Sequence, residues 1–325
     1  MPAEWAPHSC CWIAWPTRET IWGKHLQAAK EGYANVSRAI AGFEPVKLLC
    51  PAGFVSEAEE MCGPNIDVIP WDLDDSWMRD MGPNFLKNGH ETAVSVFHFN
   101  AWGRKYRKYR KDAALGNRMA EALGIRCFTS PVYMEGGGIC SDGEGTLMTT
   151  EQCILNDNRN PGISKAEAEH ELHHALGVEK VIWLPGDPQD GETDGHVDGL
   201  ACFIRPGAVL VAFDPDPGSE RHEILRRNVH ALECARDARG RKLEINYIEE
   251  APEIEEMGDR FCLSYINFYI ANGGIVMPEY GIPADERARA VVESCFPGRR
   301  IVQVDIRGVA TGGGGIHCIT QQQPV

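Results

Sequence analysis

The sequence predicts an α/β protein. Short runs rich in β-branched residues alternate with helical stretches along the whole length, which favours an α/β or mixed α+β fold over a sandwich or a helix bundle. The 325 residues are 43% apolar and 24% charged, as expected of a folded globular chain. No linker, low-complexity segment or composition break interrupts them, so we expect one continuous domain over residues 1–325.

The individual elements follow from local patterns. Apolar, β-branched runs predict strands at 46–50, 66–70, 178–184, 209–213 and 301–306. The clearest helix begins at the capping box of Ser164 and Glu167, whose side chains satisfy free N–H groups of the first turn, and it ends at Gly177. Other helices are expected at about 25–42, 112–123, 220–238 and 283–296. No sequence repeat of fixed period is visible, although structural repeats survive without one.

The charge of the chain excludes two classes of partner. Lys and Arg number 32 against 47 Asp and Glu, a formal net charge of -15, which repels nucleic-acid phosphates and anionic lipid surfaces and attracts cationic small molecules. No apolar run reaches the ~18 residues of a membrane span and the N-terminus lacks a signal-peptide pattern, so we expect a cytoplasmic protein. The 12 cysteines are scattered without a Cys-x-x-Cys pair, which favours reduced thiols. A homodimer is compatible with the sequence without being predicted by it.

One motif suggests a metal site. The run from His170 to His174 contains the His-Glu-x-x-His spacing that places two imidazoles on one helical face to bind zinc. On a helical wheel the apolar stripe around Leu172 lies opposite His170 and His174, so both histidines are expected to face water. A catalytic zinc also needs a partly enclosed cavity and a third ligand. A zinc hydrolase that uses His170 and His174 is therefore a remote alternative, and no metal or other cofactor is expected.

Acidic, imidazole and thiol groups gather in Gly-rich or turn-like segments, where functional residues are common. These segments are 74–83, 99–103, 135–138, 192–199 and 312–320. In the last of them, consecutive glycines let backbone N–H groups approach a ligand, and Cys318 follows on an expected Ile-His-Cys-Ile strand as a candidate nucleophile. An isolated cysteine near a turn is more often a buried structural residue, so the other segments decide the interpretation.

Two further pairs support a functional interpretation. His196 and Asp198 are two residues apart, so an extended strand would direct the imidazole and the carboxylate toward one ligand. Trp77 and Asp80 combine an aromatic face with a carboxylate, which suits a cation. Each pair also has an ordinary structural explanation, as a solvated polar loop in the first case and as a core tryptophan beside an Arg79–Asp80 ion pair in the second.

Together these groups suit the chemistry of a guanidinium. A guanidinium stays charged at all working pH values, and its planar donors call for carboxylates around it. Such a clamp holds the central carbon against a thiolate, and an imidazolium then protonates the nitrogen that departs. Water activated by the same imidazole hydrolyses the thiouronium intermediate, while a second acid orients the imidazole.

At these residues the sequence resembles the agmatine deiminase family, relatives of the peptidylarginine deiminases within the guanidino-group-modifying superfamily. The resemblance runs from Pro2 almost to Val325. Its motifs occur in family order: Trp-Met-Arg-Asp-x-Gly-Pro (77–83), Phe-Asn-Ala-Trp-Gly (99–103), Glu-Gly-Gly (135–137), Asp-Gly-Glu-Gly-Thr-Leu (142–147), Asn-Arg-Asn-Pro (158–161), Glu-Thr-Asp-Gly-His-Val-Asp (192–198), Ile-Ala-Asn-Gly-Gly (270–274) and Ile-His-Cys-Ile-Thr-Gln (316–321).

The resemblance implies a fold, a reaction and a set of site residues. The fold is a five-bladed, pseudo-symmetric α/β propeller of ββαβ modules around a central active site. The reaction is the hydrolysis of agmatine to N-carbamoylputrescine and ammonia, with no metal or organic cofactor. The residues carried over by motif are Cys318 as nucleophile, His196 as general acid/base, Glu135 as its orienting carboxylate, Asp80 and Asp198 as the guanidinium clamp, and Trp77 as pocket lining. Trp102 and Gly315 are further candidates for substrate binding.

Departures from the family motifs leave the substrate open. Gly315 and Gly199 stand where the family commonly has Asn, and Cys140-Ser141 replaces a usual His-Val. The basic segment, Arg104–Lys111, carries six cations where the family is generally less basic. If the basic segment borders the pocket mouth, charge complementarity favours a guanidino compound with a carboxylate tail; otherwise it is a solvated surface patch. The remaining alternatives are a deiminase or amidinotransferase for another guanidino compound, and a non-catalytic binding relative.

Overall fold

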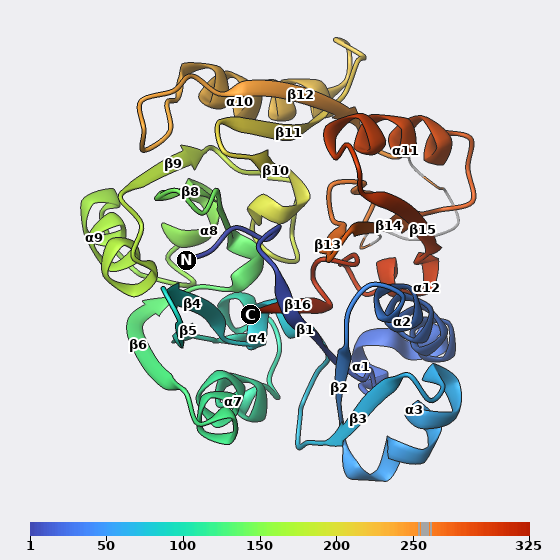
Figure 1. Cartoon of the computed structure of the whole chain (residues 1–325). Coiled ribbons are helices and arrows are strands. Elements are labelled where there is room, and N and C mark those ends of the chain that lie inside the picture. Colours follow the sequence, from blue (N-terminus) through green and yellow to red (C-terminus); the bar gives the residue numbers. More distant parts are fainter. Residues whose placement is uncertain (253, 255–259, 261) are drawn as a thin grey trace. The chain divides into compact units, whose positions relative to one another are not determined.

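The computed structural model describes residues 1–252, 254, 260 and 262–325. Within them the strands form five small mixed sheets, and helices connect the strands (Figure 1). In each sheet one strand pairs antiparallel with one neighbour and parallel with the other. This confirms the α/β class, and the five sheets correspond to the five ββαβ modules that the resemblance implied.

The chain divides into two compact units. The first unit comprises Met1–Ala6 and Asp80–Glu249, and the second comprises Pro7–Arg79 and Glu250–Val325. The expectation of a single domain over residues 1–325 stays a prediction.

The first unit contains three of the sheets, with strand orders β4-β5-β6, β7-β8-β9 and β10-β11-β12. The strands are β4 (Asn84–Asn88), β5 (Glu91–His98), β6 (Arg126–Tyr133), β7 (Ile139–Ser141), β8 (Thr146–Thr150), β9 (Lys180–Leu184), β10 (Ala201–Arg205), β11 (Ala208–Phe213) and β12 (Glu244–Glu249).

The helices of this unit each lie in a connection between two parallel strands of one sheet. They are α5 (Ala101–Arg104), α6 (Arg110–Ala113), α7 (Leu115–Leu123), α8 (Glu151–Ile154), α9 (Lys165–Leu176) and α10 (Glu220–Cys234). Helix α9 packs against β6 and β9, and α10 packs against β9 and β11. An apolar cluster that includes Phe97, Leu147, Leu172 and Val181 fills the space beneath α9.

The second unit contains the sheets β16-β1-β2-β3 and β13-β14-β15. The strands are β1 (His8–Ala14), β2 (Val46–Cys50), β3 (Ile66–Pro70), β13 (Tyr269–Ala271), β14 (Gly274–Glu279), β15 (Arg300–Asp305) and β16 (Thr320–Pro324). The helices are α1 (Glu19–Trp22), α2 (Leu26–Ala41), α3 (Val55–Cys62), α11 (Ala284–Cys295) and α12 (Arg307–Ala310). The short α4 (Met78–Met81) contains the position along the chain, between Arg79 and Asp80, at which the division falls. Because β16 pairs with β1, the two ends of the chain complete one module.

Most predicted elements are confirmed, and the differences have local causes. Strands β2 and β3 have the predicted bounds, while β9, β11 and β15 differ only at their ends. In α9 the Ser164 side chain accepts the Glu167 N–H and Gly177 has a φ of 64°, so both predicted helix ends are present. The helix predicted at 112–123 is instead split into α6 and α7, and α10 ends at Cys234 because Ala235 is extended. Over the part of the chain that the structure describes, every helix is too short or too polar to cross a membrane.

Candidate active site

The candidate residues of the first unit lie in the connections that enter its sheets. Asp80 precedes β4, Glu135 follows β6 and precedes β7, and both His196 and Asp198 precede β10. Glu135 is followed by a 3-10 turn at Gly136–Gly138. His196 is followed by a similar turn at 197–199, so the extended strand that the sequence suggested for His196 and Asp198 is wrong. The turn nevertheless brings both side chains to one place.

Glu135 and His196 form a buried pair. Their exposed fractions are 1% and 3%, and His196 Nε2 lies 3.1 Å from Glu135 Oε2. Burial alone would raise the pKa of Glu135, but the Arg159 guanidinium and His196 outweigh it and lower this pKa from 4.5 to about 2. Burial would lower the pKa of His196, but the negative charge of Asp80 and contacts with Cys153 and Glu135 raise it well above 6.5. The pair therefore favours a carboxylate beside an imidazolium.

Arg159 is a residue to which the sequence assigned no role. Its Nε and Nη2 donate to the two Glu135 oxygens at 2.9 and 3.2 Å, and Nη1 donates to Asp194. Nη2 also donates to the Thr193 carbonyl at 2.9 Å. This bidentate contact fixes the Glu135 carboxylate in both position and charge. The available signal was the Asn-Arg-Asn-Pro run, which was noted only as a motif.

Three functional groups meet at Gly137. A Cβ at this position would lie 2.6 Å from His196 Nδ1, 2.9 Å from Asp198 Oδ2 and 2.9 Å from Asp80 Oδ1. Among the described residues His196 Nδ1 has no hydrogen-bond partner, and it lies 3.8 Å from Asp80 Oδ1. Two buried carboxylates and one imidazole therefore surround the Gly137 backbone, which has no side chain to separate them. They form a buried cluster of acidic groups in the first unit.

Asp80 is held by two donors. The Gly137 N–H donates to its Oδ1 and Trp102 Nε1 donates to its Oδ2, each at 2.9 Å. Burial raises the pKa of Asp80, the His196 charge opposes this effect, and the neighbouring Asp198 and Glu135 charges add to it. Trp102 was predicted to line a pocket, and the structure places its indole N–H on a candidate substrate-binding carboxylate.

The turn that carries Trp102 has an unusual backbone. Residues 101–104 all have positive φ, with values of 57°, 54°, 86° and 65°. The Asn100 side chain accepts the Gly103 N–H at 2.7 Å, and a Cβ at Gly103 would lie 2.4 Å from the Asn158 side chain. Only glycine fits that position, which explains the last residue of the Phe-Asn-Ala-Trp-Gly motif. Strained backbone held in this way is common at functional sites.

The basic segment is tied to the same network. Lys105 Nζ donates to Asp194 Oδ2 and to the Glu192 carbonyl, each at 2.8 Å, and the Tyr106 hydroxyl donates to Glu192 Oε2 at 2.7 Å. Asp194 thus links Lys105 to Arg159. At least one cation of the basic segment has a structural partner inside the first unit.

The second unit carries the candidate nucleophile. Cys318 is 8% exposed, and its Sγ donates to Asn267 Oδ1 at 3.4 Å. Residues 316–319 form a turn, so the expected Ile-His-Cys-Ile strand is wrong, and β16 begins only at Thr320. The Thr320 hydroxyl, which donates to the carbonyls of Ile316 and His317 at 2.9 and 3.1 Å, stabilises this turn.

One glycine of the Gly-rich segment, Gly314, lies between Trp77 and Cys318. Trp77 stacks on Trp22 with ring centroids 5.4 Å apart. A Cβ at Gly314 would lie 2.4 Å from the Trp77 ring and 3.1 Å from the Cys318 Cβ, so the ring and the thiol flank one glycine. Asn267 is a second residue that sequence reasoning missed, because no motif drew attention to it.

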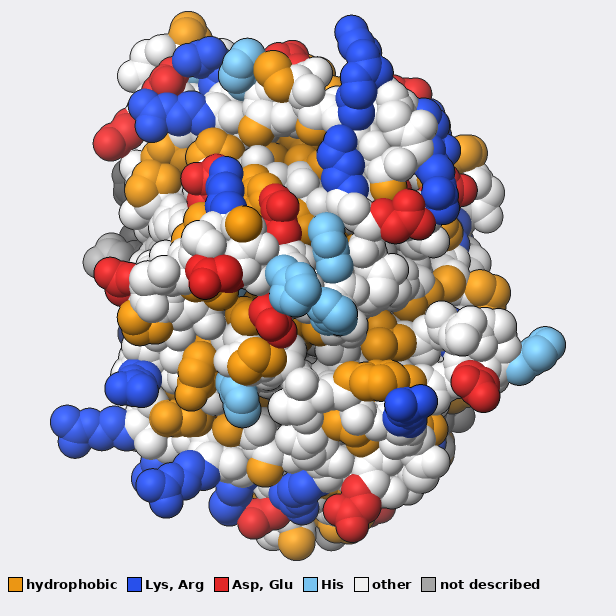
Figure 2. Space-filling model, turned by 90° about the vertical axis from the view of Figure 1, so that its left-hand side faces the viewer, with side chains coloured by type: hydrophobic (Ala, Val, Ile, Leu, Met, Phe, Trp, Pro, Cys, Tyr) orange, Lys and Arg blue, Asp and Glu red, His pale blue; other side chains and the backbone are white. Residues whose placement is uncertain are grey.

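The two histidines that suggested a metal site lie on an exposed helix face. His170 and His174 are exposed on α9 with ring centroids 4.5 Å apart, as predicted, and the face that carries α9 shows neighbouring histidines among acidic side chains (Figure 2). Among the described residues, the only group of three close ligand atoms is Glu135, Cys153 and His196. The Arg159 guanidinium already binds the Glu135 carboxylate, and its positive charge opposes the binding of a metal cation there.

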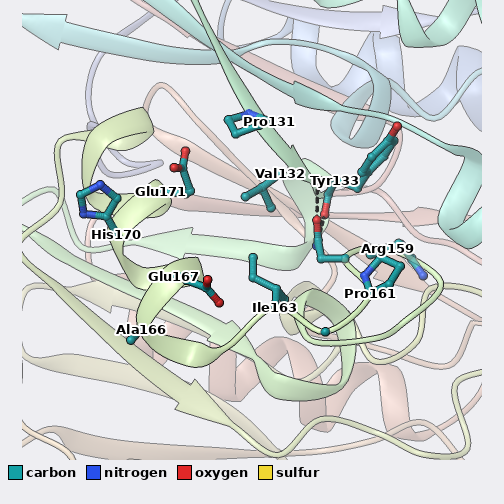
Figure 3. A pocket seen from close by; sticks show the side chains of 12 residues that line it. Pro131, Val132, Tyr133, Arg159, Pro161, Ile163, Ala166, Glu167, His170 and Glu171 are labelled. Atoms are coloured by element: carbon teal, nitrogen blue, oxygen red, sulfur yellow. Dashed lines mark hydrogen bonds between the residues drawn. The ribbon is translucent and has the colours of Figure 1, made fainter.

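A groove also lies between α9 and the end of β6 (Figure 3). Its volume is about 690 Å³, and its lining includes Val132, Ile163, Glu167 and His170. The Asn160 side chain, which bonds the Tyr133 N–H and carbonyl at 2.9 Å each, closes it on one side. The groove is also lined by Arg159, which binds Glu135, while Asp80, Glu135, His196, Asp198 and Cys318 do not line it.

Comparisons with known proteins agree with this chemistry. A profile of the Porphyromonas-type peptidyl-arginine deiminases matches residues 1–324. A Legionella pneumophila relative is 45% identical over 328 residues, which cover 100% of this chain and 94% of that protein. An agmatine deiminase of Pseudomonas aeruginosa is 40% identical over 349 residues, covering 100% and 95%. Among solved structures, an agmatine deiminase of Enterococcus faecalis is similar with a TM-score of 0.95 and 33% identity, covering 100% of this chain and 95% of that one.

Proposed function

This chain belongs to the Porphyromonas-type peptidyl-arginine deiminase family, and from that premise we propose that it hydrolyses agmatine to N-carbamoylputrescine and ammonia. The observation that carries the proposal is the meeting of Asp80, Asp198 and His196 around Gly137. Two fixed carboxylates beside an imidazole suit a planar cation whose C–N bond is to be broken. The choice of agmatine as the substrate follows from the relatives that are named agmatine deiminases.

The substrate guanidinium would bind at the buried acidic groups around Gly137 in the first unit. The carboxylates of Asp80 and Asp198 accept N–H groups of the guanidinium, and Trp77 packs against its plane. The two donors that already hold Asp80, Gly137 and Trp102, fix its carboxylate before the substrate arrives. Such preparation lowers the reorganisation that binding and reaction require.

The chemistry would proceed in two halves. In the first half the Cys318 sulfur bonds to the guanidinium carbon and its thiol proton passes to solvent. The His196 imidazolium then protonates one amino group, whose C–N bond breaks to release ammonia. In the second half neutral His196 takes a proton from water as the water oxygen bonds to the thiouronium carbon. The S–C bond then breaks and leaves Cys318 as a thiolate, which takes the extra proton of the ureido product. The released ammonia takes a proton from solvent and becomes ammonium.

Glu135 would act through His196. Its carboxylate lies on Nε2, which leaves Nδ1 for the reacting groups. A carboxylate in that position orients the ring and stabilises the imidazolium, as the third member of a catalytic triad does. Because Arg159 keeps Glu135 ionised, this support persists throughout the working pH range.

The substrate tail is the open part of the proposal. Lys105 is engaged by Asp194, which reduces the positive charge that the basic segment offers to a carboxylate tail. We therefore favour agmatine over a guanidino acid. A reducing, cytoplasmic setting is also proposed, supported by twelve free cysteines and by a nucleophile that must stay reduced.

The decisive experiment compares products from three substrates. Ammonia and ureido product are measured with agmatine, arginine and 4-guanidinobutyrate, using wild type, Cys318→Ala and, as a matched buried cysteine, Cys50→Ala. We expect agmatine turnover that falls about 10⁴-fold or more only in Cys318→Ala and is unaffected by chelator.

Other outcomes would redirect the assignment. Turnover that survives in Cys318→Ala would overturn the nucleophile, and a loss with chelator would restore the zinc-hydrolase alternative. If the enzyme prefers 4-guanidinobutyrate and Arg107→Glu reverses this preference, the basic segment binds the carboxylate tail of the substrate. Transfer of the amidino group without free ammonia would indicate an amidinotransferase.

A further inference from the structure

Two tryptophans of the second unit lie ring on ring. Trp22, the last residue of α1, stacks on Trp77 with ring centroids 5.4 Å apart and an angle of 27° between the ring planes. Both side chains are buried, with exposed fractions of 2% and 6%. In the proposed function Trp77 packs against the guanidinium plane, so Trp22 contacts the ring on which the substrate would lie.

Ring contacts, and not a hydrogen bond, hold the Trp22 indole. Its Nε1 is buried and has no acceptor among the residues that the structure describes, although a buried tryptophan N–H usually finds a partner. Besides the stack on Trp77, its ring meets Tyr33 with centroids 6.0 Å apart and perpendicular planes. Because no polar contact orients Trp22, the two stacked rings depend on each other for their orientation.

Two glycines make room for the stacked rings. A Cβ at Gly312 would lie 2.4 Å from the Trp22 ring and 3.0 Å from the Trp77 ring. A Cβ at Gly314 would lie 2.4 Å from the Trp77 ring and 3.1 Å from the Cys318 Cβ. Neither glycine has a positive φ, so space alone excludes a side chain at these positions. The backbone of 312–314 thus lies against both rings and beside the candidate nucleophile.

Polar contacts anchor the backbone next to both tryptophans. Arg18, the residue before α1, forms an ion pair with Asp75 in which Nη1 lies 2.9 Å from Oδ2. The Tyr33 hydroxyl of α2 lies 2.9 Å from the hydroxyl of Ser76, which directly precedes Trp77. These contacts fix the two chain segments, and the stack with Trp22 then sets the plane of the Trp77 ring.

We propose that Trp22 is a positioning residue that fixes the plane of the Trp77 ring and thereby the place of the guanidinium carbon relative to the Cys318 sulfur. A cation stacked on an aromatic face takes its orientation from that face. A reacting carbon that is misplaced by about 1 Å reacts roughly 10²-fold more slowly. Trp22 acts through Trp77 and takes no part in the chemistry. The inference rests on the proposed function, in which Trp77 contacts the guanidinium and Cys318 attacks it.

The test measures kcat and KM for agmatine in two variants of Trp22. Trp22→Leu removes the stacked ring, so kcat should fall about tenfold to 10²-fold. KM should change by less than about threefold, because the carboxylates of Asp80 and Asp198 still bind the cation. Trp22→Phe keeps an aromatic face against Trp77, so its kcat should stay within about threefold of wild type.

A double-mutant cycle shows whether Trp22 acts through Trp77. Trp77→Leu should lower kcat at least as much as Trp22→Leu, and the double variant should lose little more, because the two rings act through one contact. Circular dichroism follows the contact itself. The exciton couplet of two stacked indoles should be weaker in Trp22→Leu and in Trp77→Leu than in wild type.

Gly312→Ala tests the contact with both tryptophans present, and it serves if Trp22→Leu does not fold. Its methyl group displaces the rings, so kcat should fall about tenfold. The matched control is Gly53→Ala in the same unit, where a Cβ would meet nothing within 4 Å. The control for the tryptophan is Trp12→Leu, which removes a buried indole whose N–H donates to Gln323 Oε1 at 2.8 Å. Both controls should keep the kcat and the couplet of wild type.

The outcomes separate this inference from the proposed function. Wild type that does not turn over agmatine would overturn both. Normal wild-type turnover with an unchanged kcat in Trp22→Leu and Gly312→Ala would overturn the inference alone. A kcat loss of the same size in Trp12→Leu, or losses that add in the double variant of Trp22 and Trp77, would reduce Trp22 to a residue of the core. A loss of kcat that phenylalanine restores, and that is absent once Trp77 has been replaced, supports the inference.

Discussion

The candidate residues of the two units lie in different local surroundings. In the first unit the carboxylates of Asp80, Glu135 and Asp198, the His196 imidazole and the Arg159 guanidinium are all buried together. In the second unit the Cys318 thiol donates to the Asn267 amide oxygen at 3.4 Å, and a Cβ at Gly314 would lie 3.1 Å from the Cys318 Cβ. The candidate clamp and acid/base residues thus lie among charged partners, whereas the candidate nucleophile donates to a neutral amide.

The largest effect is expected where the charged groups meet. Gly137→Ala places a methyl group within 2.9 Å of Asp80, Asp198 and His196, so these groups must separate. Because misplacement of about 1 Å costs roughly 10²-fold in rate, kcat/KM for agmatine should fall by about 10²- to 10³-fold. Steady-state kinetics with agmatine measure this fall in kcat/KM. Gly138→Ala is the matched control, since its Cβ would lie at ordinary contact distances, 3.4 Å from Cys153 Sγ, 3.7 Å from His196 Cδ2 and 3.8 Å from Met134 Cγ. Equal activity of both variants would mean that the charges in the first unit are not rigidly placed.

A smaller effect is expected from the guanidinium that supports the pair. Arg159→Lys keeps the charge and loses the bidentate contact with Glu135, so kcat should fall about tenfold to 10²-fold. Arg159→Met also removes the charge. The pKa of Glu135 then rises, because burial is opposed by His196 alone. The carboxylate protonates as pH falls, so the acid-side decline of kcat/KM should begin at a higher pH than in wild type.

The matched control for this prediction lies in the same unit. Arg221 forms an ion pair with Asp187. Arg221→Lys should leave the pH profile of kcat/KM unchanged. If Arg159→Met loses activity without this shift of the acid-side decline, Glu135 does not depend on Arg159 for its charge, and the contrast between the two units weakens.

Sequence reasoning reached some of this arrangement, and its failures are instructive. The bounds of α9 were predictable because the capping box of Ser164 and Glu167 acts within one helical turn. The candidate residues Cys318, His196 and Asp80 were predictable because each lies in a distinctive motif. The five modules were not visible, since a ββαβ pattern sets hydrogen-bond pairing and leaves the side chains free to vary.

What the sequence did not reveal depends on long-range contacts. Arg159 meets Glu135 across 24 positions, and Asn267 meets Cys318 across 51. No local pattern encodes such pairs. The apolar alternation at 316–319 suggested a strand, but the Thr320 hydroxyl stabilises a turn there. In the same way, the alternation around Asp198 gave no sign of the 3-10 turn that brings its carboxylate to His196.

The smallest effect should come from charge that is exposed. His170 and His174 lie on the solvent side of α9, outside any group of three close ligand atoms in the described ranges. The double substitution of His170→Gln and His174→Gln should therefore change kcat/KM by less than about twofold, because groups in water have little influence on a buried reaction centre. Zinc titration by calorimetry and agmatine turnover with and without chelator provide the measurements. A chelator-sensitive activity that disappears in the double variant would show that exposed imidazoles contribute to catalysis. The buried charges around Gly137 would then not account for the activity on their own.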